Sequence, residues 1–313
     1  MKFKYAIGID GGSTKTHAAI VDSDFNIITE LTYNRPAHYK QIGGIKNLAK
    51  LIISLCDEII AQKSNIKPED INFVCLGATG MGTEQEQLEL TNEIKKRGFK
   101  FPFVVTNDAI IALLGGTDKD YGILVISGTG SIAIGIDENG KIERIGGWGA
   151  LLGDEGSGYI IGLKGLRYLA KSLDGRLEKT KLKDFIFEEL NIKDVFELRN
   201  WSLEVGFQKS KIAALAPAVF KAYRAGDKLA AKIIENEASE IALAVNTLIK
   251  KLKFENKEVE IVAAGGNLIH NGDYFNLVSD KIKEKYPKAN LILPKQSACV
   301  GAVRYGMRFL NKK

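Results

Sequence analysis

The chain has 313 residues, enough for about two domains of ordinary size, and its 45% hydrophobic and 26% charged residues are typical of a globular protein. No apolar run approaches the roughly 20 residues of a membrane-spanning helix. The N-terminus also runs into a strand-like segment without a signal peptide's pattern, so we expect a cytoplasmic protein. The net charge of +6 comes from dispersed Lys and Arg residues, which favours neither a nucleic-acid nor a membrane partner.

The first part of the chain predicts an alternation of strands and helices. Apolar runs at 5–9 and 18–21 flank a glycine-rich turn, another strand follows within 22–34, and the helical spacing of apolar residues at 44–62 predicts an amphipathic helix. The next predicted elements are a buried strand at 71–80, a helix at 84–98, a strand at 101–108 and a short helix at 109–116.

The pattern begins again near residue 123. Residues 123–142 repeat the order of strand, small-residue loop and strand, followed by a hairpin turn at Asn139-Gly140 and a third strand. The matching loop chemistry favours an internal duplication. The rest is predicted as a mostly helical stretch at 155–253, a strand at 259–268, a helix at 274–286, a strand at 290–294 and a helix at 298–310. We therefore expect domains at 1–118 and 119–297, with the segment 298–313 packing back on the first domain.

The three cysteines lie far apart in apolar segments. Cys56, Cys75 and Cys299 form no CxxC pair, so neither a disulfide framework nor a zinc site is indicated. We expect these side chains to pack as small hydrophobic groups.

The turn DGGSTKT at 10–16 is a candidate phosphate loop. It is neither a dinucleotide fingerprint nor a P-loop, because a strand follows it rather than a helix. Glycines in such a hairpin let backbone N–H groups approach an anion, and Asp10 would hold Mg²⁺ through water. The alternative is an ordinary hairpin turn that carries an exposed Lys and Thr.

Two later loops strengthen the phosphate interpretation. SGTGS at 127–131 is a second small-residue hairpin. AAGGN at 263–267 follows a strand, and its glycines would let a flat adenine ring lie against the backbone. The candidate nucleotide-binding residues are Asp10, Gly11, Gly12, Ser13, Thr14, Lys15, Thr16, Gly128, Thr129, Gly130, Ser131, Gly265, Gly266 and Asn267.

Five motifs together resemble a known family. DGGSTKT, TNDA, SGTGS, GGWGALLGDEGSG and AAGGN are similar to motifs of the actin–hexokinase–Hsp70 superfamily, and most of all to the N-acetylglucosamine kinase-like group of the BadF/BadG/BcrA/BcrD ATPase family. The likeness spans about residues 5–305, and the block at 146–158 is its most specific part. The resemblance implies an α/β fold of two RNase H-like (actin-like ATPase) lobes flanking an ATP/sugar cleft. It also implies ATP and Mg²⁺ as cofactors and a homodimer.

The resemblance also assigns roles to single residues. Asp108, at a strand-to-helix junction, is implied to be the catalytic base that accepts the proton of a sugar hydroxyl. Asp154 is implied to bind sugar hydroxyls, with Gly147, Trp148 and Gly149 along the N-acetyl group. Helix capping is the alternative for Asp108 and for Asp154 or Ser157, and a core position is the alternative for Trp148. The Ala-rich segment that contains Ala213 is similar to a segment beside the nucleotide.

One position departs from the family pattern. Relatives carry a sugar-contacting Asn five residues before a glycine, and here His38 stands at that distance from Gly43. With Arg35 and Lys40 nearby, this loop would accept the acidic lactyl group of N-acetylmuramic acid. The alternative for His38 is an ordinary surface position.

The expected activity is ATP-dependent phosphorylation of an N-acetylated amino sugar such as N-acetylglucosamine or N-acetylmuramic acid. We expect the hydroxyl at C6 to be the acceptor. The alternatives are glucosamine as the substrate, or an ATPase of the BadF type that activates a partner enzyme through an iron–sulfur cluster. The apolar surroundings of the cysteines argue against the cluster. A third alternative, a zinc-containing sugar kinase, is disfavoured because the sequence lacks a cluster of Cys and His ligands.

Overall fold

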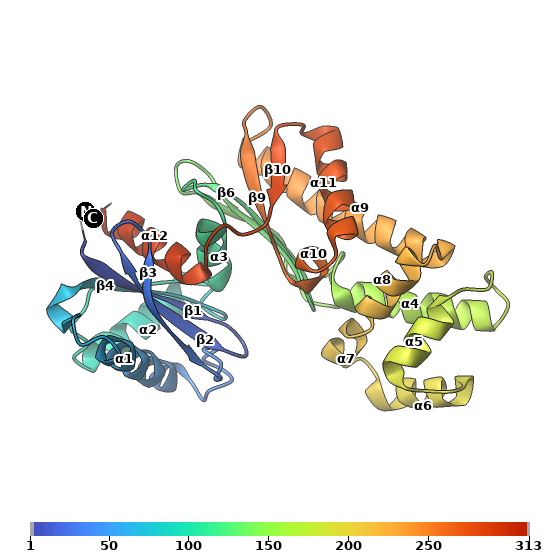
Figure 1. Cartoon of the computed structure of the whole chain (residues 1–313), viewed down its shortest axis with the longest axis horizontal. Coiled ribbons are helices and arrows are strands. Elements are labelled where there is room, and N and C mark those ends of the chain that lie inside the picture. The colour runs from blue at the N-terminus through green and yellow to red at the C-terminus, as the bar shows by residue number, and fades with distance from the viewer. Residues whose placement is uncertain (1–2, 312–313) are drawn as a thin grey trace. The chain divides into compact units, whose positions relative to one another are not determined.

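The computed structural model describes residues 3–311, which divide into two compact units. Unit 1 contains residues 3–122 and 294–311, and unit 2 contains residues 123–293. Each unit has its own five-stranded sheet with helices packed on it (Figure 1). The α/β class expected from the sequence is therefore confirmed.

Unit 1 is built on a mixed sheet with the strand order β3-β2-β1-β4-β5. The first three strands are antiparallel neighbours, whereas β4 and β5 continue the sheet in parallel. The elements are β1 (Tyr5–Gly11), β2 (Thr16–Asp22), β3 (Ile27–Tyr33), α1 (Ile45–Ala61), the 3-10 turn η1 (Pro68–Asp70), β4 (Ile71–Ala78), α2 (Glu84–Lys96), β5 (Phe103–Thr106), α3 (Asp108–Gly116) and α12 (Ala298–Asn311).

Unit 2 repeats this strand arrangement. Its sheet order is β10-β9-β6-β7-β8, so that read from β8 it matches the order of unit 1 with β6 in the place of β1. The predicted duplication is thus confirmed. The strands are β6 (Gly122–Ser127), β7 (Ser131–Ile136), β8 (Ile142–Gly146), β9 (Val259–Ala264) and β10 (Ala289–Ile292). The helices are α4 (Gly158–Leu173), α5 (Leu182–Leu190), α6 (Val195–Val205), α7 (Lys209–Ala213), α8 (Ala216–Arg224), α9 (Lys228–Lys251), α10 (Gly266–Ile269) and α11 (Gly272–Lys285).

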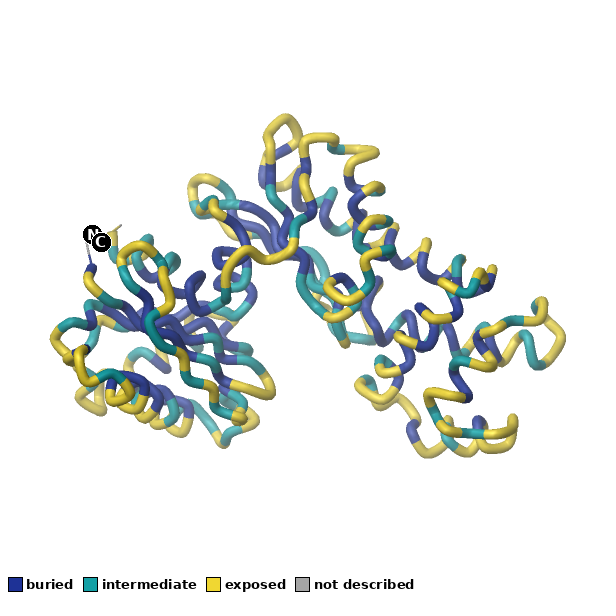
Figure 2. The backbone as a smooth tube through the Cα atoms, in the orientation of Figure 1, coloured by how far each residue is buried: buried dark blue, intermediate teal, exposed yellow. Residues whose placement is uncertain are grey.

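The sheet of unit 1 is covered on both faces. One cluster of buried side chains joins it to α1 and α2, and a second joins the opposite face to α3 and α12. Figure 2 shows the resulting buried strands at the centre of the unit. Strands buried on both faces have near-continuous apolar sequences, which explains why β1 and β4 were recognisable from the sequence.

Glycines allow α12 to pack closely within unit 1. A Cβ on Gly8 would lie 1.9 Å from the carbonyl oxygen of Cys299, and a Cβ on Gly301 would lie 1.9 Å from that of Ile111. Because such contacts are sterically impossible for any other residue, these two glycines fix how the C-terminal helix approaches β1 and α3.

One predicted element is partly wrong. The strand expected at 259–268 ends at Ala264, because Gly265 takes a positive φ of 84° and starts the short helix α10. The turn Asn139-Gly140 between β7 and β8 has the predicted position, with Ile136 paired with Ile142.

Candidate active site

In unit 1 the ends of three strands gather the candidate acidic groups. Asp10 in β1 pairs in register with Gly77 of β4, and Gly77 pairs with Thr106 of β5. The residues that follow these parallel strands therefore lie at one edge of the sheet, where α/β folds bind ligands. The amide of Thr79 donates to the carbonyl of Gly11 at 2.9 Å, which ties the two loops together.

Asp108 begins α3 but does not cap it. The cap is Asn107, whose side chain accepts the amide hydrogen of Ile110 at 2.9 Å. The capping alternative for Asp108 is therefore wrong. Instead, its Oδ2 accepts a hydrogen bond from the hydroxyl of Thr79 at 2.5 Å, and its Oδ1 accepts one from the amide of Ala109 at 3.0 Å. Thr79 is a residue that the sequence analysis did not identify, and it fixes the orientation of this carboxylate.

Asp10 is a half-buried carboxyl group. Burial, with a further contribution from the charge of Asp108, raises its pKa from 3.8 to about 6, and His17 opposes the shift. Two carboxylates that repel each other in this way favour a bound cation. Among the described residues no three His, Cys, Asp or Glu side chains are clustered to hold a metal. This donor set fits Mg²⁺, which usually takes one or two carboxylates and completes its shell with water and phosphate.

The first glycine loop closes as a tight turn. The amide of Gly12 donates to the carbonyl of Lys15 at 3.0 Å, and Ser13, Thr14 and Lys15 are exposed. Thr16 differs from them, because it is buried and its hydroxyl donates to the carbonyl of Arg35 at 2.8 Å. The exposed residues are thus the ones available to a phosphate.

His38 lies against the loop that follows β4. A Cβ on Gly80 would be 3.2 Å from its ring, and the ring stacks on Tyr39 at a centroid distance of 5.8 Å. The Nδ1 atom is buried and has no hydrogen-bond partner among the described residues. His38 is thus partly exposed, and the buried atom of its ring lacks a hydrogen-bond partner. Since Gly80 follows Thr79 in the chain, His38 belongs to the same cluster as Asp108.

In unit 2 the second and third glycine loops pack directly on each other. A Cβ on Gly265 would lie 2.3 Å from the carbonyl oxygen of Ser127, so only glycine permits this approach. The side-chain amide of Asn267 donates to Ser127 Oγ at 3.1 Å and to the carbonyl of Gly128 at 3.2 Å. Gly265 and Asn267 therefore hold the SGTGS loop in place.

A pocket of about 530 Å³ opens beside these loops within unit 2. It is lined by the predicted residues Gly128, Thr129, Ala213, Gly266 and Asn267. The structure thus brings together residues from three separate segments of the sequence. The lining residues that sequence reasoning missed include Gly158, Ser210, Pro217, Lys221, Arg224, His270 and Asn271.

The block GGWGALLGDEGSG contains a buried acid. Asp154 is 3% exposed, has a positive φ of 66°, and accepts the amide hydrogen of Ser131 on Oδ1 at 3.2 Å. Its Oδ2 lies 2.5 Å from Nζ of Lys209. Ser157, not Asp154, caps α4 by accepting from the amide of Ile160 at 3.3 Å. Trp148 is 66% exposed beside Arg144, so the core alternative for this tryptophan is wrong.

A fully buried glutamate supports the same block. Glu237 of α9 accepts the amide hydrogen of Gly156 at 2.6 Å and pairs with Lys164 of α4. The carbonyl of Gly156 accepts from Ser127 Oγ at 2.5 Å. Hydrogen bonds thus connect the block at 146–158 to the end of β6, and the sequence offered no local signal for Glu237.

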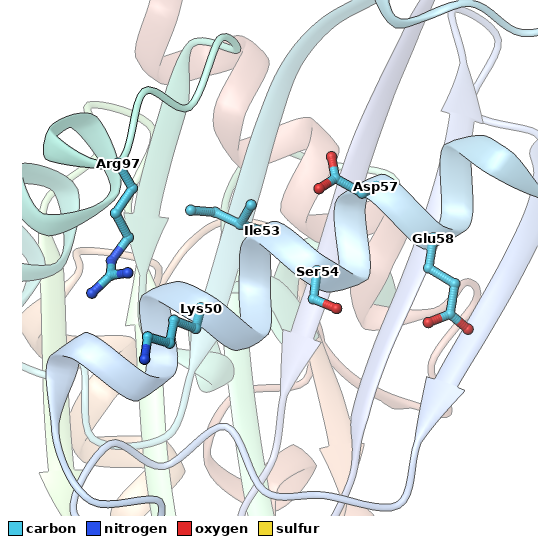
Figure 3. A pocket seen from close by; sticks show the side chains of 6 residues that line it. All are labelled: Lys50, Ile53, Ser54, Asp57, Glu58 and Arg97. Atoms are coloured by element: carbon cyan, nitrogen blue, oxygen red, sulfur yellow. The ribbon is translucent and has the colours of Figure 1, made fainter.

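A separate hollow on α1 lacks the features of a site (Figure 3). Its lining consists of Lys50, Ile53, Ser54, Asp57 and Glu58 from one face of α1, with Arg97 from the end of α2. Arg97 pairs with Glu93 at 2.7 Å. None of the predicted site residues lies here, so this surface is a solvated helix face.

The three cysteines are buried and free, as predicted. Burial raises the pKa of each thiol, which keeps it protonated. Among the described residues no helix is long and apolar enough to cross a membrane.

Comparison with known proteins defines the class. The model of the BadF/BadG/BcrA/BcrD ATPase family matches residues 7–306, and the chain belongs to this family. An N-acetylmuramic acid/N-acetylglucosamine kinase from Clostridium acetobutylicum is 36% identical over 304 residues, covering 96% of this chain and 97% of the relative. An N-acetyl-D-glucosamine kinase from Dictyostelium discoideum is 33% identical over 317 residues, covering 98% of each chain.

Solved structures support the same fold. A protein from Chromobacterium violaceum, proposed to be an N-acetylglucosamine kinase, superposes with a TM-score of 0.71 at 22% identity, over 97% of this chain and 99% of the other. A ROK family glucokinase from Streptomyces griseus, solved with glucose and AMPPNP, gives a TM-score of 0.55 at 18% identity over 98% of each chain. The two sheets are therefore those of the actin-like sugar kinase fold.

Proposed function

We propose that the protein is an ATP-dependent kinase that phosphorylates the C6 hydroxyl of N-acetylglucosamine or N-acetylmuramic acid. Support comes from two relatives, named as kinases of one or both of these sugars, that match nearly the whole chain. The structural observation that carries the proposal is the carboxylate of Asp108. Asn107 caps α3 in its place, and Thr79 orients it at the edge of the sheet.

Asp108 acts as the general base in this reaction. A carboxylate placed against the sugar hydroxyl accepts its proton while the oxygen attacks the γ-phosphate, and such a base contributes a factor of about 10²–10⁴ to the rate. The hydroxyl of Thr79 holds Oδ2 at 2.5 Å. This contact restricts rotation of the carboxylate and so orients the base toward its substrate.

Each of the two small-residue loops is a candidate phosphate-binding loop. Backbone N–H groups of residues 10–16 and 128–131 and the ammonium group of Lys15 supply positive electrostatic potential, the main contribution that a protein makes to phosphoryl transfer. Asp10 holds Mg²⁺ through water. The metal ion, when bound, neutralises charge on the phosphates.

The sugar-binding residues of this proposal are those that the family resemblance implies. Asp154 accepts hydrogen bonds from sugar hydroxyls, and Gly147, Trp148 and Gly149 lie along the N-acetyl group. His38, which is partly exposed, contacts a polar group of the sugar. The exposure of Trp148 supports its part in this assignment.

Three further expectations remain proposals. The family resemblance implies a homodimer, the dispersed positive charge argues against nucleic acid as a partner, and we place the protein in the cytoplasm. Light scattering tests the first of these directly.

The alternatives receive less support. A glucosamine kinase from Vibrio cholerae is 25% identical over 248 residues, a weaker match than the two kinases of acetylated sugars. Activation of a partner through an iron–sulfur cluster requires accessible thiolates, whereas all three cysteines are buried.

An ATP-consumption assay across N-acetylglucosamine, N-acetylmuramic acid, glucosamine and glucose tests the proposal. We expect turnover with the acetylated sugars, and a loss of at least 10²-fold in kcat for Asp108→Asn with sugar binding retained. Asp24→Asn, at an exposed aspartate in the β2–β3 turn, is the matched control and keeps full activity. A near-normal kcat for Asp108→Asn would exclude this residue as the base, and turnover of glucosamine alone would overturn the substrate assignment.

A further inference from the structure

A lysine that is not among the predicted site residues lies against the SGTGS loop of unit 2. Lys209 is the first residue of α7, and a Cβ on Gly130 would lie 2.8 Å from its Nζ. The ammonium group therefore rests against the backbone of the SGTGS loop. The Lys209 side chain is 38% exposed, so a ligand on this loop has access to it.

The same ammonium group is paired with the candidate sugar-binding acid. Nζ of Lys209 lies 2.5 Å from Asp154 Oδ2, while Asp154 Oδ1 accepts the amide hydrogen of Ser131 at 3.2 Å. Oδ1 is thus hydrogen-bonded to the phosphate loop, whereas Oδ2 has the ion pair with Lys209 but no hydrogen-bond partner among the described residues. A sugar hydroxyl that approaches Asp154 competes with the ammonium group of Lys209.

We propose that Lys209 binds the phosphates of the nucleotide at loop 128–131. Its ammonium group leaves Asp154 and moves to these phosphates when the nucleotide binds. A lysine ammonium is a compact positive charge that suits phosphate oxygens, and its stem is long and flexible. Once it moves to a phosphate, Oδ2 of Asp154 becomes free to accept a sugar hydroxyl. This inference rests on the proposed kinase function and adds a coupling between its two substrates.

The exchange has a thermodynamic consequence. If nucleotide binding releases Asp154 for the sugar, the nucleotide raises the affinity for sugar, and the sugar raises the affinity for nucleotide by the same factor. Couplings of this kind are typically fivefold or more. A lysine that only stabilised the fold would produce no such reciprocal effect.

The first experiment measures the phosphate contact by isothermal titration calorimetry of AMP-PNP with Mg²⁺ and of adenosine. For Lys209→Met we expect the Kd of AMP-PNP to rise tenfold or more, as for the loss of a charged hydrogen bond. The Kd of adenosine, which lacks phosphates, stays within twofold. Lys211→Met is the matched control, because Lys211 is an exposed lysine on the same helix; its values should match those of the unaltered protein. An unchanged Kd for AMP-PNP, or an equal loss for adenosine, overturns the contact.

The second experiment measures the coupling. The Kd of AMP-PNP is determined with and without saturating N-acetylglucosamine, and we expect the sugar to lower it about fivefold or more in the unaltered protein. In Lys209→Met the ratio falls to about one, and Lys209→Arg retains part of it. A ratio of one in the unaltered protein, or the same ratio in the Met variant, overturns the exchange. If the protein does not phosphorylate these sugars, the comparison of AMP-PNP with adenosine still tests whether Lys209 binds phosphate. Failure of the kinase function is therefore distinguishable from failure of the Lys209 contact.

Discussion

Replacement of Asp10 by asparagine should stabilise the protein near neutral pH in the absence of ligands. Asp10 is half-buried in β1, and its partial burial together with the charge of Asp108 raises its pKa to about 6. The folded protein therefore opposes ionisation of this carboxyl group. Asparagine has nearly the same shape but carries no charge, so Asp10→Asn removes this unfavourable interaction.

The magnitude follows from the pKa. A rise from 3.8 to about 6 is equivalent to about 3 kcal/mol of unfavourable free energy for the ionised group. Between these two pH values the folded state retains a proton that the unfolded state has lost, so the free energy of unfolding falls as the pH rises. Below pH 3.8 the carboxyl group is protonated in both the folded and the unfolded state, so the unfavourable free energy disappears. Above about pH 6 this free energy applies in full. The advantage of Asp10→Asn should therefore grow by about 2–3 kcal/mol between pH 4 and pH 7.5.

Urea unfolding of the metal-free protein at pH 4 and pH 7.5 measures this difference. Asp24→Asn, at an exposed aspartate in the same unit, is the control and should show no such gain. Mg²⁺ with ADP should stabilise the unaltered protein more than Asp10→Asn, because ligands that bind only the folded state raise its stability. If Asp10→Asn is no more stable than the unaltered protein at pH 7.5, Asp10 is not an electrostatically strained acid and the reasoning fails.

Three other variants test the site and the packing. His38→Asn should shift the ratio of kcat/KM between N-acetylmuramic acid and N-acetylglucosamine, and an unchanged ratio in steady-state assays would remove His38 from the sugar site. Gly301→Ala should destabilise the protein by about 3 kcal/mol in urea, because its Cβ would overlap the carbonyl oxygen of Ile111; wild-type stability would contradict the close helix packing. Glu237→Ala leaves the amide of Gly156 and the ammonium of Lys164 without their partner, so we expect a loss of about 3 kcal/mol by thermal or urea unfolding, and a loss below 1 kcal/mol would argue against the buried network.

The sequence predicted those features whose signals are local. Apolar runs located β1 and β4, and the matching loops after the first strand of each half indicated the duplication that the sheet orders confirm. Some residues that line the unit 2 pocket, such as Gly128 and Gly266, were also among the candidates, because glycines mark backbone that turns or approaches another group closely. Such signals act over a few residues and need no knowledge of tertiary contacts.

Contacts between distant segments left no such signal. Thr79 and Asp108 are 29 residues apart, and Glu237 and Gly156 are 81 residues apart. A threonine or glutamate in an ordinary strand or helix sequence does not reveal its tertiary partner. The capping alternative for Asp108 was likewise undecidable from composition, since Asn107 and Asp108 are both good capping residues. Only the backbone geometry shows that Asn107 takes this role.

The block at 146–158 separates into two parts with different physical causes. Gly156 has a positive φ of 78°, and a Cβ there would lie 2.3 Å from the side chain of Ile241, so packing alone explains this glycine. Trp148, Leu151 and Leu152 are instead 66%, 94% and 72% exposed. Large apolar side chains gathered on a surface gain stability only when something covers them. The exposed apolar side chains in the first half of the motif are therefore the part that packing does not explain, and we expect the acetylated sugar to make its apolar contact there.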